Sequence, residues 1–158
     1  MNFLGRILAS CLMIPALAAL GLNGCALSGS GRAGHSFVAS GYPAAAEAVV
    51  AEALAEELAG LFPPGHTAVY LKPAGSGSET LGQAIDQALR SRGFTVVPAP
   101  SGEALSVAYV LDRLDEETWY SRLSLSGGAV IARVYQAQGE RFIPGAAARA
   151  MDGSGGAE

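Results

Sequence analysis

Two stretches of the chain carry hydrophobic residues three and four positions apart, which is the spacing of one face of an α-helix. The first predicts a helix over residues 44–61, preceded by Pro43 and ended by a proline-rich turn at residues 62–65. The second predicts a helix over residues 79–92, ended by Gly93 in the left-handed conformation. Each helix has one apolar stripe, so we expect both helices to bury one face.

Other segments show the alternating or continuous apolar patterns that are typical of β-strands. Short strands are predicted at residues 67–71 and 94–97, on either side of the second helix, and an antiparallel meander is predicted after them. The strands of this meander are expected at residues 105–111, 119–125, 129–135 and 142–143. The sequence therefore predicts an α+β fold, in which two helices pack on a mixed or antiparallel sheet of four to six strands.

The first residues of the chain resemble the signal peptide of a bacterial lipoprotein. Arg6 supplies a positive charge, and residues 7–20 form an apolar run that is too short for an ordinary transmembrane helix. Residues 22–25, Leu-Asn-Gly-Cys, then resemble a lipobox, in which a small residue precedes a cysteine that receives a diacylglyceryl group. We therefore expect residues 1–24 to be a lipoprotein signal peptide and Cys25 to be the lipid attachment site. An ordinary secretory signal followed by a chance cysteine is the alternative.

The cysteine content supports lipid attachment. The chain has two cysteines, and Cys11 lies in the apolar run that would leave with the signal peptide. Exported proteins normally pair their thiols, so a single cysteine at the new N-terminus is better explained by acylation than by a disulfide. Two or three acyl chains would hold the protein stably on a membrane. In lipoproteins of enteric type an aspartate after the cysteine favours the inner membrane, so Ala26 points to the outer membrane.

The composition divides the rest of the chain into three parts. Residues 25–43 are rich in Gly, Ser and Ala and are predicted to form a flexible tether. Residues 44–150 hold the predicted helices and strands and are expected to form one globular domain. Residues 151–158 can bury almost nothing and are expected to be a disordered tail. His35 and Ser36 lie in the tether, which could not hold them as a base and a nucleophile, so His35 is interpreted as a solvated linker residue.

Charge and residue type argue against several kinds of chemistry. The whole chain has 10 basic and 14 acidic residues, and removing residues 1–24 takes away Arg6 and no acidic residue, which leaves a formal charge of −5. Lys72 is the single lysine and the arginines are scattered, so we expect no direct binding to nucleic acid. The sequence has no cluster of Cys and His and no nucleophile–base pair, so we predict no metal, no cofactor and no enzymatic activity.

We interpret the glycine-rich loop before the second helix, and two glutamates of the first helix, as structural features and not as binding or catalytic sites. Ser76 and Glu79 have the spacing of a helix capping box, and Ser78 is a second candidate cap. We prefer capping to a phosphate-binding loop, because the glycine spacing of such loops is missing. Glu56 and Glu57 are neighbours in the first predicted helix and are assigned to its solvated surface.

Two arginines and a histidine complete the candidate polar residues. Arg122 and Arg133 are expected on facing positions of adjacent strands, where they would form a polar surface stripe or, as the less favoured reading, part of a partner interface. His66 follows a Pro-Pro-Gly turn and is expected to be exposed or to act as a cap. None of the three points to catalysis.

Six short motifs follow one another within the predicted globular domain. They are Leu61-Phe62-Pro63-Pro64-Gly65-His66-Thr67, Leu89-Arg90-Ser91-Arg92-Gly93-Phe94, Tyr109-Val110-Leu111-Asp112, Tyr120-Ser121-Arg122, Ala132-Arg133-Val134-Tyr135 and Pro144-Gly145-Ala146. Their order and spacing resemble the TrbH family of conjugal transfer lipoproteins. The resemblance covers residues 51–149, together with the lipobox.

The resemblance implies a component of mating pair formation, the type IV secretion apparatus that carries DNA between cells. It implies a lipoprotein that is anchored in the outer membrane by acyl chains such as palmitate and faces the periplasm. There it would contact core-complex proteins as part of a hetero-oligomeric ring, in a structural role. A lipid-tethered periplasmic module that binds peptidoglycan or a small ligand is the alternative.

Overall fold

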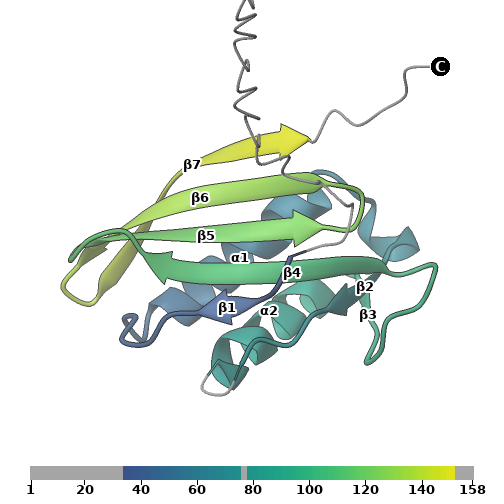
Figure 1. The fold of residues 1–158 in the computed structure, drawn as a ribbon, viewed down its shortest axis with the longest axis horizontal. Helices are drawn as coiled ribbons and strands as arrows, with labels where there is room; N and C mark the ends of the chain where they lie inside the picture. The colour runs from purple at the N-terminus through teal and green to yellow at the C-terminus, as the bar shows by residue number, and fades with distance from the viewer. Residues whose placement is uncertain (1–33, 76–77, 152–158) are drawn as a thin grey trace, which may run out of the picture.

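The computed structural model describes residues 34–75 and 78–151, so the predicted signal peptide, Cys25 and residues 152–158 of the predicted tail lie outside the described residues. The elements in chain order are β1 (Phe37–Val38), α1 (Ala46–Ala59), the 3₁₀ turn η1 (Pro64–His66), β2 (Ala68–Leu71), α2 (Glu79–Ser91), β3 (Thr95–Val96), β4 (Leu105–Arg113), β5 (Thr118–Leu125), β6 (Ala129–Gln138) and β7 (Arg141–Met151). The strands belong to one sheet, and Figure 1 shows how helices α1 and α2 lie against it.

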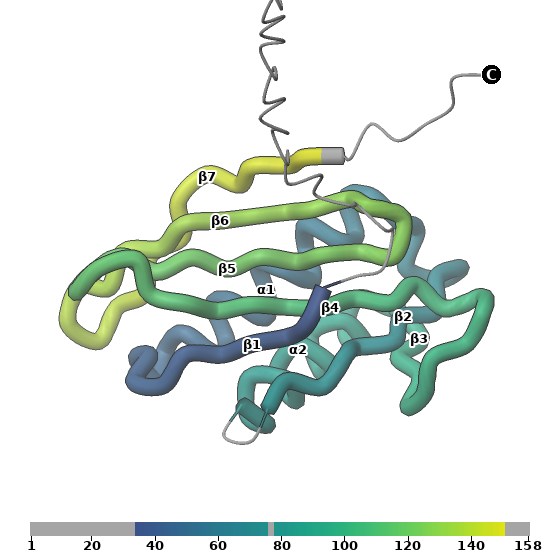
Figure 2. The backbone as a smooth tube through the Cα atoms, viewed as in Figure 1, coloured from purple at the N-terminus to yellow at the C-terminus, as the bar shows by residue number. Residues whose placement is uncertain are grey.

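The strands form a single mixed sheet. Its main path is β3-β2-β4-β5-β6-β7, and β1 pairs with β4. The pairs made by β1, β2 and β3 are parallel, whereas β4 to β7 form an antiparallel meander. Helices α1 and α2 cover the same face of the sheet (Figures 1 and 2). Within residues 34–75 and 78–151, no helix covers the other face, which we call the open face. The predicted α+β class is confirmed, and β1 is the strand that the sequence did not predict.

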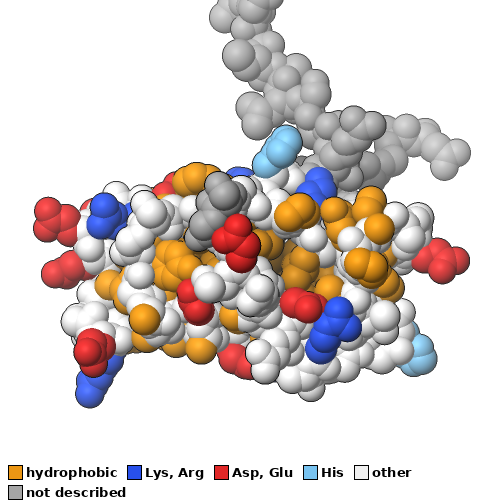
Figure 3. All heavy atoms as spheres, turned by 90° about the horizontal axis from the view of Figure 1, so that it is seen from below, with side chains coloured by type: hydrophobic (Ala, Val, Ile, Leu, Met, Phe, Trp, Pro, Cys, Tyr) orange, Lys and Arg blue, Asp and Glu red, His pale blue; other side chains and the backbone are white. Residues whose placement is uncertain are grey.

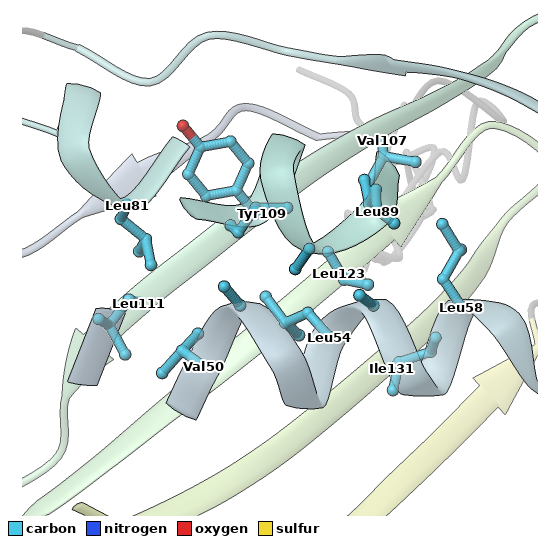
Figure 4. Packing of buried hydrophobic residues seen from close by; sticks show 14 of the residues in the cluster. Val50, Leu54, Leu58, Leu81, Leu89, Val107, Tyr109, Leu111, Leu123 and Ile131 are labelled. Carbon is cyan, nitrogen blue, oxygen red and sulfur yellow. The ribbon is translucent and has the colours of Figure 1, made fainter. Parts of the chain in front are cut away.

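The core lies between the two helices and the covered face of the sheet (Figure 4). α1 contributes the predicted stripe of Val50, Leu54 and Leu58, all of which are buried. Leu61, predicted on the same stripe, is exposed because α1 ends at Ala59. The largest buried side chains from α2 and the sheet are Leu81, Ile85, Leu89, Leu111, Trp119, Leu123, Leu125, Ile131 and Tyr135.

The ends of α2 follow the sequence prediction in part. Gly93 has a φ of 92°, which is the left-handed conformation expected of a glycine after a helix. At the other end, Ser78 occupies the N-cap position but its side chain makes no capping hydrogen bond. Its hydroxyl instead donates to the carbonyl oxygen of Gly75. Ser76, the first residue of the predicted capping box, lies outside the described residues.

β7 is much longer than the two residues that the sequence predicted. Proline, glycine and alanine disfavour strands, which is why residues 144–150 gave no strand pattern. The strand forms because it pairs with β6 along its length, with a register shift near Pro144. Gly145 fits there because a Cβ atom on it would lie 3.1 Å from the Val134 carbonyl oxygen. Met151, assigned to the tail, is the last residue of β7 and pairs with Ala129.

Candidate functional site

The chain enters the described fold through Ser36, which fills a gap along one edge of β4. β2 pairs with β4 up to Val107, and β1 pairs with it from Val110 onward. Between them, the Ser36 hydroxyl donates a hydrogen bond to the Lys72 carbonyl oxygen (2.8 Å) and accepts one from the Tyr109 backbone N–H (3.1 Å). An unpaired buried N–H would cost free energy, so Ser36 completes the ladder of β4.

A second contact holds the segment before Ser36. The ammonium group of Lys72 donates a hydrogen bond to the Gly34 carbonyl oxygen (3.1 Å). The structure therefore differs from the predicted tether, which extended to residue 43. A segment rich in glycine, serine and alanine lacks an apolar pattern, so the sequence did not reveal that one serine hydroxyl joins it to the sheet.

The two histidines lie apart from any shared site. His35 is exposed beside β1, and the neighbouring Ser36 hydroxyl is already bonded to two backbone groups. His66 ends η1 and is exposed, as predicted. Across residues 34–75 and 78–151, no group of three or more His, Cys, Asp or Glu side chains is placed to hold a metal ion.

A buried ion cluster joins α1 to the last two strands. Glu57 is 6 % exposed and its carboxylate accepts hydrogen bonds from Arg133 of β6 and Arg149 of β7, the latter at 2.9 Å from Nε. The assignment of Glu57 to the solvated surface is wrong, whereas its neighbour Glu56 is exposed as predicted. Successive residues of a helix point about 100° apart, so one of two adjacent glutamates can face the sheet while the other faces solvent.

The interaction of Arg133 with Glu57 also corrects the expected arginine stripe. In the register of β5 and β6, Arg122 pairs with Ala132 and Arg133 pairs with Ser121. Because side chains alternate between the faces of a sheet, the two arginines lie on opposite faces. Arg133 points toward the helices and Arg122 toward the open face. The facing arrangement predicted from the sequence is wrong by one residue of register.

Two opposing effects act on the pKa of Glu57. Burial alone would raise the pKa of the carboxyl group. The hydrogen bonds from Arg149 and Arg133, and the positive charges of these two side chains, outweigh burial, so the pKa is lowered from its ordinary value of 4.5. Glu57 is therefore ionised at neutral pH, and the cluster acts as a structural connection between α1, β6 and β7.

A groove of about 470 Å³ lies between α2 and the strands β2 and β3. Figure 3 views the molecule from the side on which α2 and β1 lie, and shows hydrophobic side chains with acidic and basic groups among them. The polar side chains that line the groove are Lys72, Ser78, Glu79, Gln83, Asp86, Arg90 and Tyr109. Arg90 is already engaged, because it donates to Asp86 and to the Val96 carbonyl oxygen, both at 2.8 Å. The groove has the size of a small-ligand site.

Tyr109 reaches this groove from the core. Its ring is buried, and in Figure 4 its hydroxyl points away from the apolar cluster, beside α2. Burial raises the pKa of the Tyr109 hydroxyl, which also hydrogen-bonds to the backbone at Ala74. Gly82 makes room for it, because a Cβ atom at position 82 would lie 2.6 Å from the hydroxyl oxygen. An isolated glycine inside a predicted helix is the sequence signal that could have revealed this contact.

We expect Gly82→Ala to lower the free energy of unfolding by about 1–3 kcal/mol, because the new methyl group collides with the Tyr109 hydroxyl. Helix propensity alone predicts the opposite sign, with alanine about 1 kcal/mol better than glycine. Denaturant unfolding of Gly82→Ala in the original chain and in a Tyr109→Phe chain separates the two effects. The destabilisation should shrink or reverse in the Tyr109→Phe chain, and an equal loss in both chains would rule the collision out.

The open face of the sheet carries both apolar and polar side chains. The strand registers place five uncharged polar residues there, namely Ser106, Thr118, Ser124, Gln136 and Gln138. One row across it, read from the strand registers, contains Phe37, Val110, Arg122, Ala132 and Ala148. Three large hydrophobic side chains on this face are exposed, namely Phe37 (51 %), Val134 (42 %) and Ile143 (41 %). Within β1 and β4 to β7, alternation places three charged residues there, namely Asp112, Arg122 and Arg141.

One of three comparisons with known proteins supports the family resemblance seen in the sequence. The family model described as conjugal transfer protein TrbH matches residues 32–153, which include all the described strands and helices. No curated protein and no solved structure gave a significant match. Neither described helix is long and apolar enough to cross a membrane. Because the family model covers most of the sequence, the chain belongs to the TrbH family of conjugal transfer proteins.

Proposed function

We propose that this chain is a lipid-anchored structural component of a conjugative type IV secretion apparatus, attached to the outer membrane through Cys25 and facing the periplasm. The observation that carries the proposal is the lipobox-like sequence at residues 22–25, which ends seven residues before the segment matched by the TrbH family begins. A lipid anchor, a short connection and a compact docking domain are the parts that such a component needs. Its partners would be core-complex proteins, arranged with it in a hetero-oligomeric ring.

The described surface suits contact with other proteins better than chemistry. Three polar side chains that are buried or partly buried, those of Glu57, Ser36 and Tyr109, make hydrogen bonds to other segments of the same domain. A general base or nucleophile must instead be free to reach a substrate. This supports a structural role for the domain and gives no support to an enzymatic one.

Cys25→Ser is expected to release the protein from the outer membrane and to abolish most plasmid transfer, because no other acylation site would remain at the N-terminus. Donor cells carrying the variant would be fractionated and mated with recipients. Cys11→Ser is the matched control, since Cys11 lies in the predicted signal peptide and its loss should change neither membrane attachment nor transfer. Transfer and envelope association that survive Cys25→Ser unchanged would refute the proposal.

The groove between α2, β2 and β3 is the observation that favours the alternative, a lipid-tethered binding module for peptidoglycan or a small ligand. The two functions predict different binding partners for the protein after it has been solubilised from the membrane. A secretion component should be purified together with core-complex proteins, whereas a cell-wall module should sediment with isolated sacculi. Sedimentation with sacculi in the absence of other envelope proteins would favour the alternative.

A further inference from the structure

We propose that the open face of the sheet lies against the bilayer to which Cys25 is attached, so that the two helices face away from the membrane. This inference rests on the proposed lipid anchor and adds an orientation to it. It is carried by where the chain enters the fold, by the length of the connection to Cys25, and by the distribution of apolar and charged side chains over the two sides of the domain.

The chain enters the described fold on the open face. Gly34 lies against β5, because a Cβ atom on it would be 4.0 Å from the Ser124 hydroxyl oxygen. Ser124 pairs with Ala108 and Val130 and alternates with the buried Leu123, so its side chain is on the open face. The hydrogen bonds made by Gly34 and Ser36 hold this segment in place.

Because these contacts attach Gly34 and Ser36 to the sheet, the connection from the fold to the lipid is short. Gly34 is nine positions after Cys25, instead of the eighteen positions that a tether up to residue 43 would give. Nine residues span at most about 30 Å when fully extended, and a flexible chain of that length averages about 17 Å. The surface at which the connection begins must therefore stay close to the bilayer. That surface is the open face.

Side-chain type favours the same orientation. The open face exposes Phe37, Val134 and Ile143, of which Phe37 directly follows the point where the chain enters the fold. Its charged residues on β1 and β4 to β7 are two arginines and one aspartate, so it carries no excess of negative charge against anionic lipid. On the opposite side, the helices and the C-cap of α2 carry two arginines, Arg90 and Arg92, which pair with Asp86 and Glu52. Acidic residues are in excess there, and they are Glu47, Glu52, Glu56, Glu57, Glu79 and Asp86. The acidic helix side suits water or a basic protein surface better than a lipid surface.

The test uses the full chain expressed in a Gram-negative host, purified from envelopes and reconstituted in vesicles of phosphatidylethanolamine and phosphatidylglycerol. An environment-sensitive fluorophore is attached at Val134→Cys on the open face, with Gln87→Cys on the exposed side of α2 as the matched control. Acylation blocks Cys25 and Cys11 leaves with the signal peptide, so the introduced thiol is the one that reacts. Both substitutions replace exposed side chains, so the fold should be preserved.

Each outcome is decisive. Blue-shifted emission from position 134 that nitroxide lipids quench, with water-exposed and unquenched emission from position 87, supports the orientation. Equal exposure of positions 134 and 87 to water overturns the orientation and leaves the lipid anchor standing. Protection of position 134 in native envelopes but not in lipid vesicles also overturns the orientation, because a protein would then cover the open face. An unsubstituted chain that takes up the fluorophore and does not float with vesicles overturns the lipid anchor itself, and the orientation with it.

Discussion

Glu57→Gln is expected to lower the free energy of unfolding by about 3 kcal/mol at neutral pH, because it leaves Arg133 without its buried counter-ion. Glu57 is 7 % exposed and Arg133 is 18 % exposed at their side chains, so neither charge is well hydrated in the fold. Arg149 is half exposed and can turn to solvent, which limits the loss. The change should also loosen β6 and β7, since Glu57 bonds to both strands.

Glu56→Gln provides a matched control for this measurement. It changes the same functional group one position earlier in α1, but Glu56 is exposed. Surface substitutions of this kind change stability by less than about 0.5 kcal/mol. Chemical denaturation of the three chains should therefore separate Glu57→Gln from the other two, and similar unfolding free energies for both variants would mean that the ion cluster does not stabilise the fold.

The same cluster predicts a dependence on pH. The pKa of Glu57 is lowered in the fold, so its contribution to stability is complete above its unfolded value, near 4.5, and is lost as pH falls through the lower folded value. The difference in unfolding free energy between the original chain and Glu57→Gln should therefore stay constant above pH 4.5 and narrow below it. A difference that grows on acidification would contradict the sign of the shift.

Phe142→Ala is expected to destabilise the domain by about 3–5 kcal/mol, because it removes a large ring from the core. Phe142 is the second residue of β7 and is buried on the covered side of the sheet. Its ring stacks on Tyr135 with centroids 4.8 Å apart and meets Trp119 edge-on at 6.4 Å. The variant also tests whether the alanine-rich remainder of β7 depends on this contact.

Ile143→Ala is the control for Phe142→Ala. It shortens the next side chain of the same strand, but Ile143 lies on the open face and is exposed. Thermal unfolding of the two variants should show a large loss for Phe142→Ala and a small one for Ile143→Ala. Comparable losses would mean that the assigned faces of β7, and with them the open face, are wrong.

The regular elements could be predicted because their patterns are local. The helices were predicted at residues 44–61 and 79–92 and lie at Ala46–Ala59 and Glu79–Ser91. The meander strands follow their alternating patterns, and Gly93 has the predicted conformation. In these segments the spacing of apolar residues decides both the type of element and the buried face.

The sequence did not predict contacts between segments that lie far apart along the chain. Glu57 is one of several glutamates in α1, and nothing local distinguishes it from the others. Its partners Arg133 and Arg149 are 76 and 92 residues away in the sequence. β7 has the composition of a loop and becomes a strand through its pairing with β6. Ser36 acts through one hydroxyl in a segment without any apolar pattern. In each case long-range pairing outweighs local propensity.

Together these features are relevant to the proposed role at the membrane. The family membership assigns the chain to conjugal transfer. The described domain offers a first segment that is bonded to the sheet at Gly34 and Ser36, a covered core and an open face with exposed hydrophobic side chains. A component that braces a larger assembly needs a fixed distance and orientation relative to its membrane. If Cys25 carries lipid as proposed, the contacts of Gly34 and Ser36 would shorten the connection to the bilayer and limit how far the domain can move from it.

Mass spectrometry of the mature N-terminal peptide, prepared from the envelopes of cells that express the full chain, tests this most directly. The account predicts a peptide that begins at Cys25 and carries a thioether-linked diacylglyceryl group, with the mass of its fatty chains lost after alkaline hydrolysis. A mature chain that begins at another residue, or an unmodified Cys25 thiol, would contradict it.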